Sequence, residues 1–136
     1  MAWARPLLLS PARISSGRLP IVRDEPDQVA ALVNAALDDA RTQAIITTGG
    51  TGITSRDGTF EAVNALLEKR LDGFGELFRM LSYEEIGASA MMSRATAGTA
   101  RRKAIFVLPG SQDAVRLAMT RLIVPELPHV IQQVNR

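Results

Sequence analysis

The stretch that most restricts how this chain can fold is IITTGGTGITSRD, residues 45–57. It begins in an apolar run at residues 44–48 that is rich in β-branched side chains, which is typical of a strand buried between two layers of helices. Three glycines then allow a tight turn, and apolar residues at helical spacing follow from residue 60 to residue 67. This order predicts a buried parallel strand, a glycine turn and a helix.

A second strand, turn and helix unit lies closer to the C-terminus. Residues 104–108 form the clearest apolar run of the chain, and Pro109, Gly110 and Ser111 end it, with Ser111 placed to cap the next helix. Ligands of such folds bind beyond the carboxyl ends of parallel strands, where helix N-termini attract anions. The turns at residues 49–59 and 109–113 are therefore the candidate sites. Taken alone, each turn is also explained by chain geometry.

Amphipathic helices account for most of the remaining chain. We expect one that begins at Pro26, one after the turn at residues 72–75, a helical continuation at residues 88–92, and two near the C-terminus that Pro125 separates. Thr59 is the expected N-cap after the first glycine turn, and residues 19–22 are interpreted as a strand end. The apolar faces comprise Val29, Leu32, Val33, Ala36, Leu37, Phe60, Val63, Leu66, Leu67, Leu77, Phe78, Leu81, Val115, Ala118, Met119, Leu122, Ile123, Leu127, Val130, Ile131 and Val134. Strands that alternate with helices predict an α/β fold with a mainly parallel sheet.

The composition excludes several classes of protein. With 136 residues the chain suits one domain. It has no cysteine, which excludes disulfides and cysteine-based zinc sites and fits a reducing compartment, so we expect a cytoplasmic protein. The pI is near 9.7, yet the net charge is only +2 and aromatic residues are 4%, so we expect no nucleic-acid partner. No apolar run approaches the roughly 20 residues that span a bilayer, so we expect no membrane association.

Residues 1–18 differ from the rest of the chain. They contain Arg5, Arg13 and Arg18 but no acidic residue, and they show no sustained periodicity. We interpret them as an irregular leader; a transit peptide, which shares the Arg- and Ser-rich composition, is the alternative. Residues 19–136 then form the folded domain.

The first glycine turn matches neither of the common nucleotide-binding fingerprints. Gly50 and Gly52 imitate the start of G-x-G-x-x-G, but Ser55 occupies the position of the third glycine. A P-loop requires Gly-Lys-Ser/Thr, and no lysine precedes Lys69. Any phosphate groups must therefore be held in another way.

Four segments together resemble the MoaB/MogA family of molybdenum cofactor biosynthesis. They are TTGGTGITSRDGT, GFGELFRMLSYEEIG, AMMSRATAG and LPGSQDAVRLAM, in the family's order, and the resemblance extends over residues 19–129. It implies a three-layer α/β/α domain that assembles as trimers, sometimes paired into hexamers. The reaction that it implies is adenylyl transfer: with Mg²⁺, the terminal phosphate of molybdopterin is joined to the AMP part of ATP, and pyrophosphate is released.

The resemblance also assigns roles to individual residues. It places two acidic residues that are important in active relatives, and therefore catalytic, on Asp57 and Asp24. The substrate-binding residues that it implies are Gly49, Gly50, Thr51, Gly52, Ser93, Arg94, Pro109, Gly110 and Ser111. The first glycine turn then holds the phosphates of the substrates.

The implied chemistry agrees with these residue types. Attack of one phosphate on the α-phosphorus of ATP brings several negative charges together, so catalysis consists largely of alignment and charge neutralisation. Asp57 and Asp24 suit Mg²⁺, which takes one or two carboxylates together with phosphate oxygens. Arg56 and Arg94 are candidate phosphate contacts. From the residues alone, Asp24 is better explained as a helix cap, Asp57 is undecided, and an arginine on a polar face is usually solvated.

The resemblance is weakest at the beginning of the chain. The family opens with a strand that lies centrally in its sheet, and nothing in residues 1–18 matches that strand. Loss of that strand would expose apolar side chains and an unpaired strand edge, and the alternative is that residues 1–18 substitute for it. Two functional classes follow: an adenylyltransferase, and a catalytically silent relative that binds pterin or a partner, or only assembles.

Overall fold

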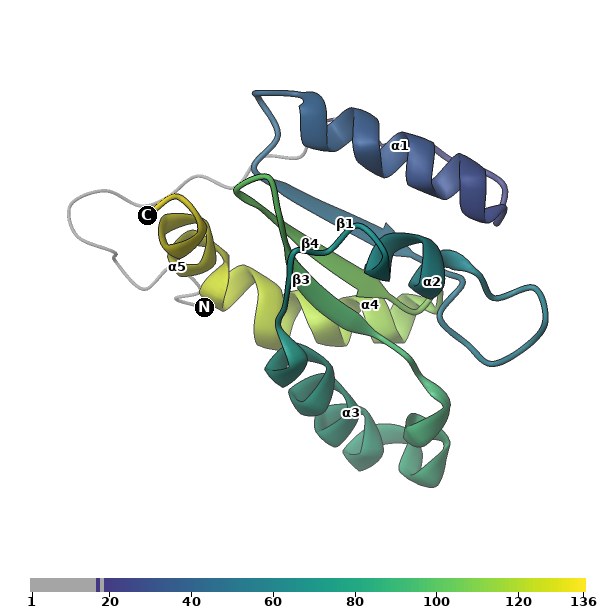
Figure 1. Ribbon diagram of the computed structural model, residues 1–136. Helices are drawn as coiled ribbons and strands as arrows, with labels where there is room; N and C mark the ends of the chain where they lie inside the picture. Colours follow the sequence, from purple (N-terminus) through teal and green to yellow (C-terminus); the bar gives the residue numbers. More distant parts are fainter. Residues whose placement is uncertain (1–16, 18) are drawn as a thin grey trace.

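The computed structural model describes residue 17 and residues 19–136 (Figure 1). Apart from Gly17, the leader predicted at residues 1–18 lies outside the described residues. The elements, in chain order, are α1 (Pro26–Asp38), β1 (Ala44–Thr48), α2 (Thr59–Asn64), β2 (Lys69–Arg70), α3 (Asp72–Ile86), the 3₁₀ helix η1 (Gly87–Met92), β3 (Thr96–Ala100), β4 (Lys103–Leu108), α4 (Gln112–Ala118), the π-helical segment η2 (Met119–Ile123) and α5 (Val124–Val134).

The described strands form one sheet in the order β1-β4-β3-β2. β1 and β4 are parallel, with Ala44 opposite Ala104 and Thr48 opposite Leu108. β3 pairs antiparallel with β4, to which a hairpin connects it directly, and it also pairs antiparallel with β2. The parallel pairing of the two strands that precede the glycine turns is thus confirmed. The sheet as a whole is mixed rather than mainly parallel.

Helices cover both faces of the sheet, as the α/β/α prediction requires (Figure 1). All six residues of β4 are buried, because the strand lies inside the sheet and its alternate side chains enter two separate cores. Phe106 and Leu108 pack with α3, α4 and α5, whereas Ile105 and Val107 pack with α1 and α2. The first core includes Phe74, Phe78, Leu81, Leu117, Ile123 and Leu127, and the second Val29, Val33, Leu37 and Val63.

β1 lies at an edge of the sheet, so the prediction that it is buried on both faces is wrong. Among the described strands only β4 pairs with it, and the side chain of Ile46 is 38% exposed. Among the described residues, the edge of β1 away from β4 therefore has no strand partner, and Ile46 exposes apolar surface. Residues 19–22, interpreted as a strand end, form no strand, and Leu19 and Ile21 are 92% and 98% exposed.

The helix that follows the first glycine turn differs from its prediction at both ends. Gly58, not Thr59, is the N-cap of α2, and Thr59 is the first residue of the helix. The helix ends at Asn64, so Leu66 and Leu67 lie beyond it and pack beside the second core. The start of α1 at Pro26 is confirmed, since proline occupies the first turn, where its missing N–H costs nothing.

The C-terminal helices run on through a π-helical segment. Pro125 lies in the first turn of α5, which continues η2, so the interruption predicted at this proline is a change of helix type. Leu127 of α5 is buried in the first core. None of the helices in the described part of the chain is long and apolar enough to span a membrane.

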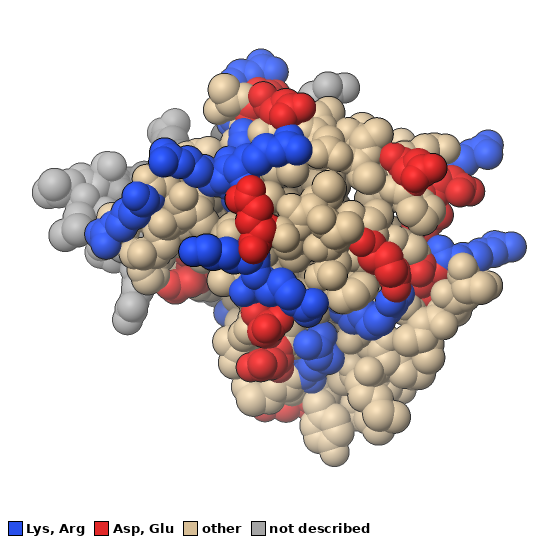
Figure 2. All heavy atoms as spheres, viewed as in Figure 1, with Lys and Arg blue, Asp and Glu red and all other residues tan. Residues whose placement is uncertain are grey.

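Acidic and basic side chains lie next to one another on the face drawn in Figure 2. Ion pairs on the described surface include Arg101 with Asp38 at 2.6 Å and Arg41 with Asp39 at 3.2 Å. The arginines of this surface are thus distributed among carboxylates, in keeping with the small net charge of +2.

Candidate functional site

The two glycine turns lie side by side at the carboxyl ends of β1 and β4. Parallel pairing brings Thr48 and Leu108 to the same edge of the sheet. The N–H of Gly49 donates a hydrogen bond to the carbonyl of Leu108 at 2.9 Å. A Cβ built on Gly110 would lie 3.4 Å from the Cα of Gly49. The two turns, far apart in sequence, therefore form one surface on which a single ligand can rest.

The first turn requires glycine at its centre. Gly49 and Gly50 have φ of 98° and 69°, a conformation that costs other residues strain. A Cβ on Gly50 would lie 2.2 Å from Oγ1 of Thr59 and 2.8 Å from Oδ1 of Asp24. Thr59 and Asp24 thus pack directly against Gly50, whereas a Cβ on Gly49 would have nothing within 4 Å, so the backbone of Gly49 is open to the close approach of a phosphate.

Asp24 lies beside this turn and does not cap α1. The N-cap of α1 is Glu25, and no side chain provides the capping hydrogen bond. Instead, the hydroxyl of Thr59, which is buried at the start of α2, donates a hydrogen bond to Oδ1 of Asp24 at 3.0 Å. The explanation of Asp24 as a cap is therefore wrong. This bond connects the segment before α1 to the helix after the first glycine turn.

Asp57 lies at the other side of the first turn, and one of its oxygens faces that turn. Oδ2 accepts hydrogen bonds from the backbone N–H and the hydroxyl of Thr54, at 2.8 and 2.7 Å. These bonds, first the hydroxyl and then the N–H, hold the pKa of Asp57 below its ordinary value, and the positive charge of Arg94 adds a smaller effect. The carboxylate is therefore ionised at neutral pH.

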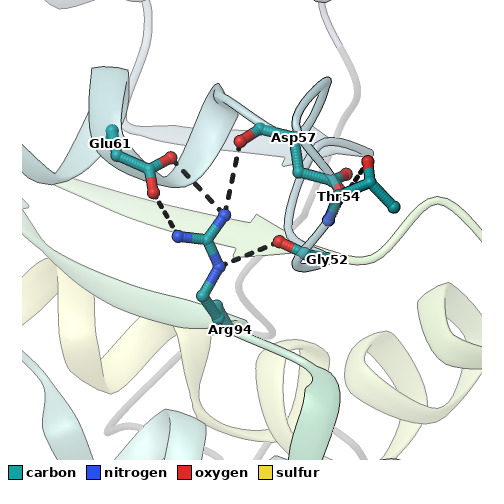
Figure 3. Close-up of polar contacts among 5 residues, drawn as sticks. All are labelled: Gly52, Thr54, Asp57, Glu61 and Arg94. Carbon is teal, nitrogen blue, oxygen red and sulfur yellow. Dashed lines mark hydrogen bonds and ion pairs between the residues drawn. The ribbon is translucent and has the colours of Figure 1, made fainter.

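Arg94 connects the first turn to the start of β3 and to α2 (Figure 3). Its Nε donates to the carbonyl of Gly52 at 2.9 Å, and Nη2 donates to the carbonyl of Asp57 at 3.4 Å. Its Nη1 pairs with the Glu61 carboxylate, and the guanidinium lies 5.0 Å from the ring centroid of Phe60. The arginine predicted to contact phosphate is thus engaged with the turn itself.

Ser93 and Arg94 also line a pocket of about 290 Å³ next to the first turn. Ser93 Oγ accepts a hydrogen bond from the N–H of Ala95 at 3.3 Å. Arg79 of α3 donates to the carbonyls of Ser93 and Ala95, at 3.3 and 2.8 Å. Side chains of both charges line the pocket: Asp72 and Glu76 of α3 lie there together with Arg79 and Arg94. It is therefore a cavity of mixed polar and apolar lining, suited to a flat ligand with donors and acceptors.

The second turn has a simpler construction. Ser111 is the N-cap of α4, and its Oγ accepts a hydrogen bond from the N–H of Ala114 at 3.1 Å, as predicted. Gly110 is exposed and Pro109 is half-buried. The main chain of this turn therefore lies open beside Gly49.

The carboxylates near the first turn fit a hard divalent cation that is shared with a ligand. In the described part of the chain, no hydrogen bond is made to Asp57 Oδ1 or Asp24 Oδ2, whereas the other oxygen of each residue is engaged. No group of three or more His, Asp or Glu side chains among these residues could enclose a metal alone. Such a site suits Mg²⁺, which takes one or two carboxylates and completes its shell with water and phosphate oxygens.

Sequence reasoning missed three side chains of this site: Glu61, Phe60 and Arg79. Glu61 and Phe60 lie in the first turn of α2. An acidic residue is common near any helix N-terminus, and an aromatic residue in a helix is usually part of the core, so neither residue type indicated a site. Arg79 lies on α3, 14 residues before Ser93, so no motif connects the two. Only the fold brings these side chains to the turn.

Comparison with known proteins places the chain in one family. A family model described as "Probable molybdopterin binding domain" matches residues 7–129. Molybdenum cofactor biosynthesis protein B of Bacillus subtilis is 52% identical over 117 residues, which cover 85% of this chain and 69% of that protein.

Solved structures agree with this match. The crystal structure of a molybdenum cofactor biosynthesis protein B superposes with a TM-score of 0.81 and 53% identity, covering 83% of this chain and 71% of that one. The tungsten cofactor synthesizing protein MoaB from Pyrococcus furiosus gives a TM-score of 0.70 and 36% identity, covering 81% and 71%. The chain belongs to the MoaB/MogA family of molybdenum cofactor biosynthesis proteins, with a molybdopterin-binding domain.

Proposed function

We propose that this protein transfers the adenylyl group of ATP to molybdopterin. The observation that carries the proposal is the contact between the two glycine turns, with the Gly49 N–H bonded to the Leu108 carbonyl. Two bare turns at the carboxyl ends of parallel strands, beside an ionised carboxylate, suit a polyphosphate that is bridged to the protein by a cation. Family membership supplies the substrate, since the matching domain is described as molybdopterin-binding.

Each part of the site has a role in this reaction. Main-chain N–H groups of residues 50–52 and 110–111 hold the phosphates of ATP and of molybdopterin in line, and Gly49 leaves room for them because it has no side chain. Asp57 and Asp24 would hold Mg²⁺, and the ion would supply positive charge beside the two phosphates. An oxygen of the molybdopterin phosphate then bonds to the α-phosphorus, the bond from that phosphorus to the β-phosphate oxygen breaks, and pyrophosphate leaves.

The pocket beside Ser93 and Arg94 is where we place the pterin. Its volume of about 290 Å³ is at the lower limit for small-molecule sites. The carboxylates of Asp72 and Glu76 suit the N–H groups of a pterin ring, and the arginine donors suit its carbonyl.

The test is calorimetric titration of the protein with ATP at saturating Mg²⁺, followed by an assay of pyrophosphate release with molybdopterin. We expect ATP to bind and pyrophosphate to be released. Asp57→Asn keeps an oxygen that can accept the Thr54 hydrogen bonds but loses the charge, so it should abolish turnover while the thermal midpoint changes little. Absence of ATP binding by the wild-type protein would overturn the proposal.

A catalytically silent relative is the second candidate, and the position of β1 favours it. β1 has no partner among the described strands on the side away from β4, so no described strand supports the first turn on that side. A silent protein would bind molybdopterin without ATP. Separate titrations with each ligand distinguish the two candidates.

We also propose that the protein assembles as a homotrimer, which can pair into a hexamer, and that it acts in the cytoplasm. Support for assembly comes from exposed apolar side chains on α3 and η1: Leu77, Met80, Tyr83, Ile86, Met91 and Met92. A patch of this kind is typical of a protein interface. Light scattering should give a mass three or six times that of the chain, and Met80→Glu with Tyr83→Glu should lower it. A monomeric wild-type protein would contradict this.

A further inference from the structure

Among the hydrogen bonds of the described residues, those to Arg94 connect the Glu61 carboxylate to the first glycine turn. It pairs with the guanidinium, and this pair also accounts first for the lowered pKa of Glu61. The same guanidinium donates to the carbonyls of Gly52 and Asp57. Glu61 therefore holds a guanidinium group whose other N–H groups donate to residues 52 and 57, the two ends of one segment of the turn.

Arg94 determines which way two peptide groups of the turn face. Its backbone N–H donates to the carbonyl of Thr51 at 3.0 Å, and its Nε donates to the carbonyl of Gly52 at 2.9 Å. In a trans peptide the carbonyl and the next N–H point in opposite directions, and the described residues contain no cis peptide. The N–H groups of Gly52 and Ile53 therefore point away from Arg94. That of Gly52 faces the Asp57 carboxylate, and only the peptide group between Gly52 and Ile53 depends on the guanidinium.

The orientation of the Arg94 side chain depends on its partners. The side chain of Arg94 is 29% exposed and that of Glu61 is 57% exposed, so water competes for the guanidinium. A planar fork needs acceptors on more than one side to stay in one orientation. Phe60 supports one face of the fork, and Glu61 supplies the charged acceptor.

From this geometry we propose that Glu61 is a positioning residue for nucleotide binding: it holds Arg94, and Arg94 orients the peptide group between Gly52 and Ile53, whose N–H then donates to the polyphosphate. The inference rests on the proposed function for its ligand. The orientation of the turn is a property of the protein that can be measured without the ligand.

The experiment compares the wild-type protein with Glu61→Gln and with the control Asp38→Asn. Both variants remove the charge of a carboxylate that pairs with an arginine, but Asp38 pairs with Arg101 at the hairpin between β3 and β4, at the opposite end of β4. Glu61→Gln should raise hydrogen exchange of the amides at residues 51–57 about fivefold or more and weaken MgATP binding about tenfold. Asp38→Asn should change neither quantity.

A double-variant comparison separates positioning from a general structural role. If Glu61 acts through Arg94, Glu61→Gln should have no further effect on MgATP affinity in an Arg94→Ala background. Unchanged exchange in residues 51–57 of Glu61→Gln would overturn the inference, as would equal weakening of affinity in both backgrounds. If wild-type protein does not bind MgATP, the proposed function fails, and the exchange measurement still decides whether Glu61 orders the turn.

Discussion

The turn after β1 and the turn after β4 occupy equivalent places at the ends of two parallel strands, yet different interactions hold them. Side chains from α2 and from the start of β3 hold the first turn, through the bonds of Arg94 to Gly52 and Asp57 and of Thr59 to Asp24. The second turn is held by its own main chain and by the Ser111 cap. The first turn thus depends on residues distant in sequence, and the second is a local structure.

This difference indicates how a site of this kind is ordered. A helix N-cap forms from residues that are already close in sequence. A turn with φ of 98° and 69° is strained unless its residues are glycine and the surroundings fix it. Substitutions in the first turn should therefore lower the free energy of unfolding more than substitutions in the second turn.

The largest expected effect is that of Gly50→Ala. The new Cβ would lie 2.2 Å from Oγ1 of Thr59, at a φ that disfavours alanine. We expect the free energy of unfolding to fall by about 2–4 kcal/mol, from strain and overpacking together. Urea unfolding monitored by circular dichroism measures this.

Gly110→Ala is the matched control in the second turn. Its Cβ would meet the Cα of Gly49 at 3.4 Å, close to ordinary contact. The free energy of unfolding should fall by no more than about 0.5 kcal/mol. Equal costs for the two substitutions would show that the turns do not differ as described.

Arg94→Ala should have the next largest effect. It removes the donors to the carbonyls of Gly52 and Asp57, and because the side chain is partly exposed we expect a loss of about 1–2 kcal/mol. Arg41→Ala is the control, since Arg41 pairs on the exposed surface and contacts neither turn. The difference between the two variants, obtained from unfolding curves, tests the role of Arg94. A cost no greater than that of Arg41→Ala would refute it.

Ser111→Ala should have a smaller effect, confined to the second turn. It removes the bond to the N–H of Ala114, so we expect a loss of about 1 kcal/mol. Ser111→Asn should recover most of it, because asparagine caps equally well. Thermal unfolding of both variants checks this, and a loss with asparagine as large as with alanine would exclude a capping role.

The smallest effect is a difference in acid sensitivity. The pKa of Asp57 is lowered by Thr54, and the pKa of Glu61 is lowered by Arg94. A lowered pKa in the folded protein contributes stability above the unfolded pKa, about 4, which is lost as pH falls through the folded value. Asp57→Asn with Glu61→Gln should flatten the fall in stability below about pH 4 relative to wild type. An unchanged pH dependence in urea unfolding would show that neither shift matters.

The main features of the site could be predicted from the sequence because they are local. The glycines, the strand ends and the Ser111 cap each depend on a few neighbouring residues. The partners of Arg94 could not be predicted, because Glu61 lies 33 residues away in sequence and only the fold brings it close.

The fold was predicted in its layers but not in all its strands. β3 consists of the small residues of TAGTA, so it shows no apolar run that predicts a strand. The hairpin to β4 turns at Arg101 and Arg102, with φ of 47° and 62°, where glycine or asparagine is usual. The antiparallel half of the sheet was therefore missed. The apolar run of residues 44–48 predicted a strand buried on both faces, whereas β1 lies at an edge among the described strands. The run does not reveal this, because burial depends on neighbouring elements that one segment does not specify.

The most direct test of the central claim is to titrate ¹⁵N-labelled protein with ATP and Mg²⁺ and follow the amide resonances of both turns. Contact between the turns, through Gly49 and Leu108, predicts that the amides of residues 49–52 and of residues 110–111 shift together, with one dissociation constant. Shifts in only one turn, or shifts that cluster elsewhere in the protein, would contradict the account.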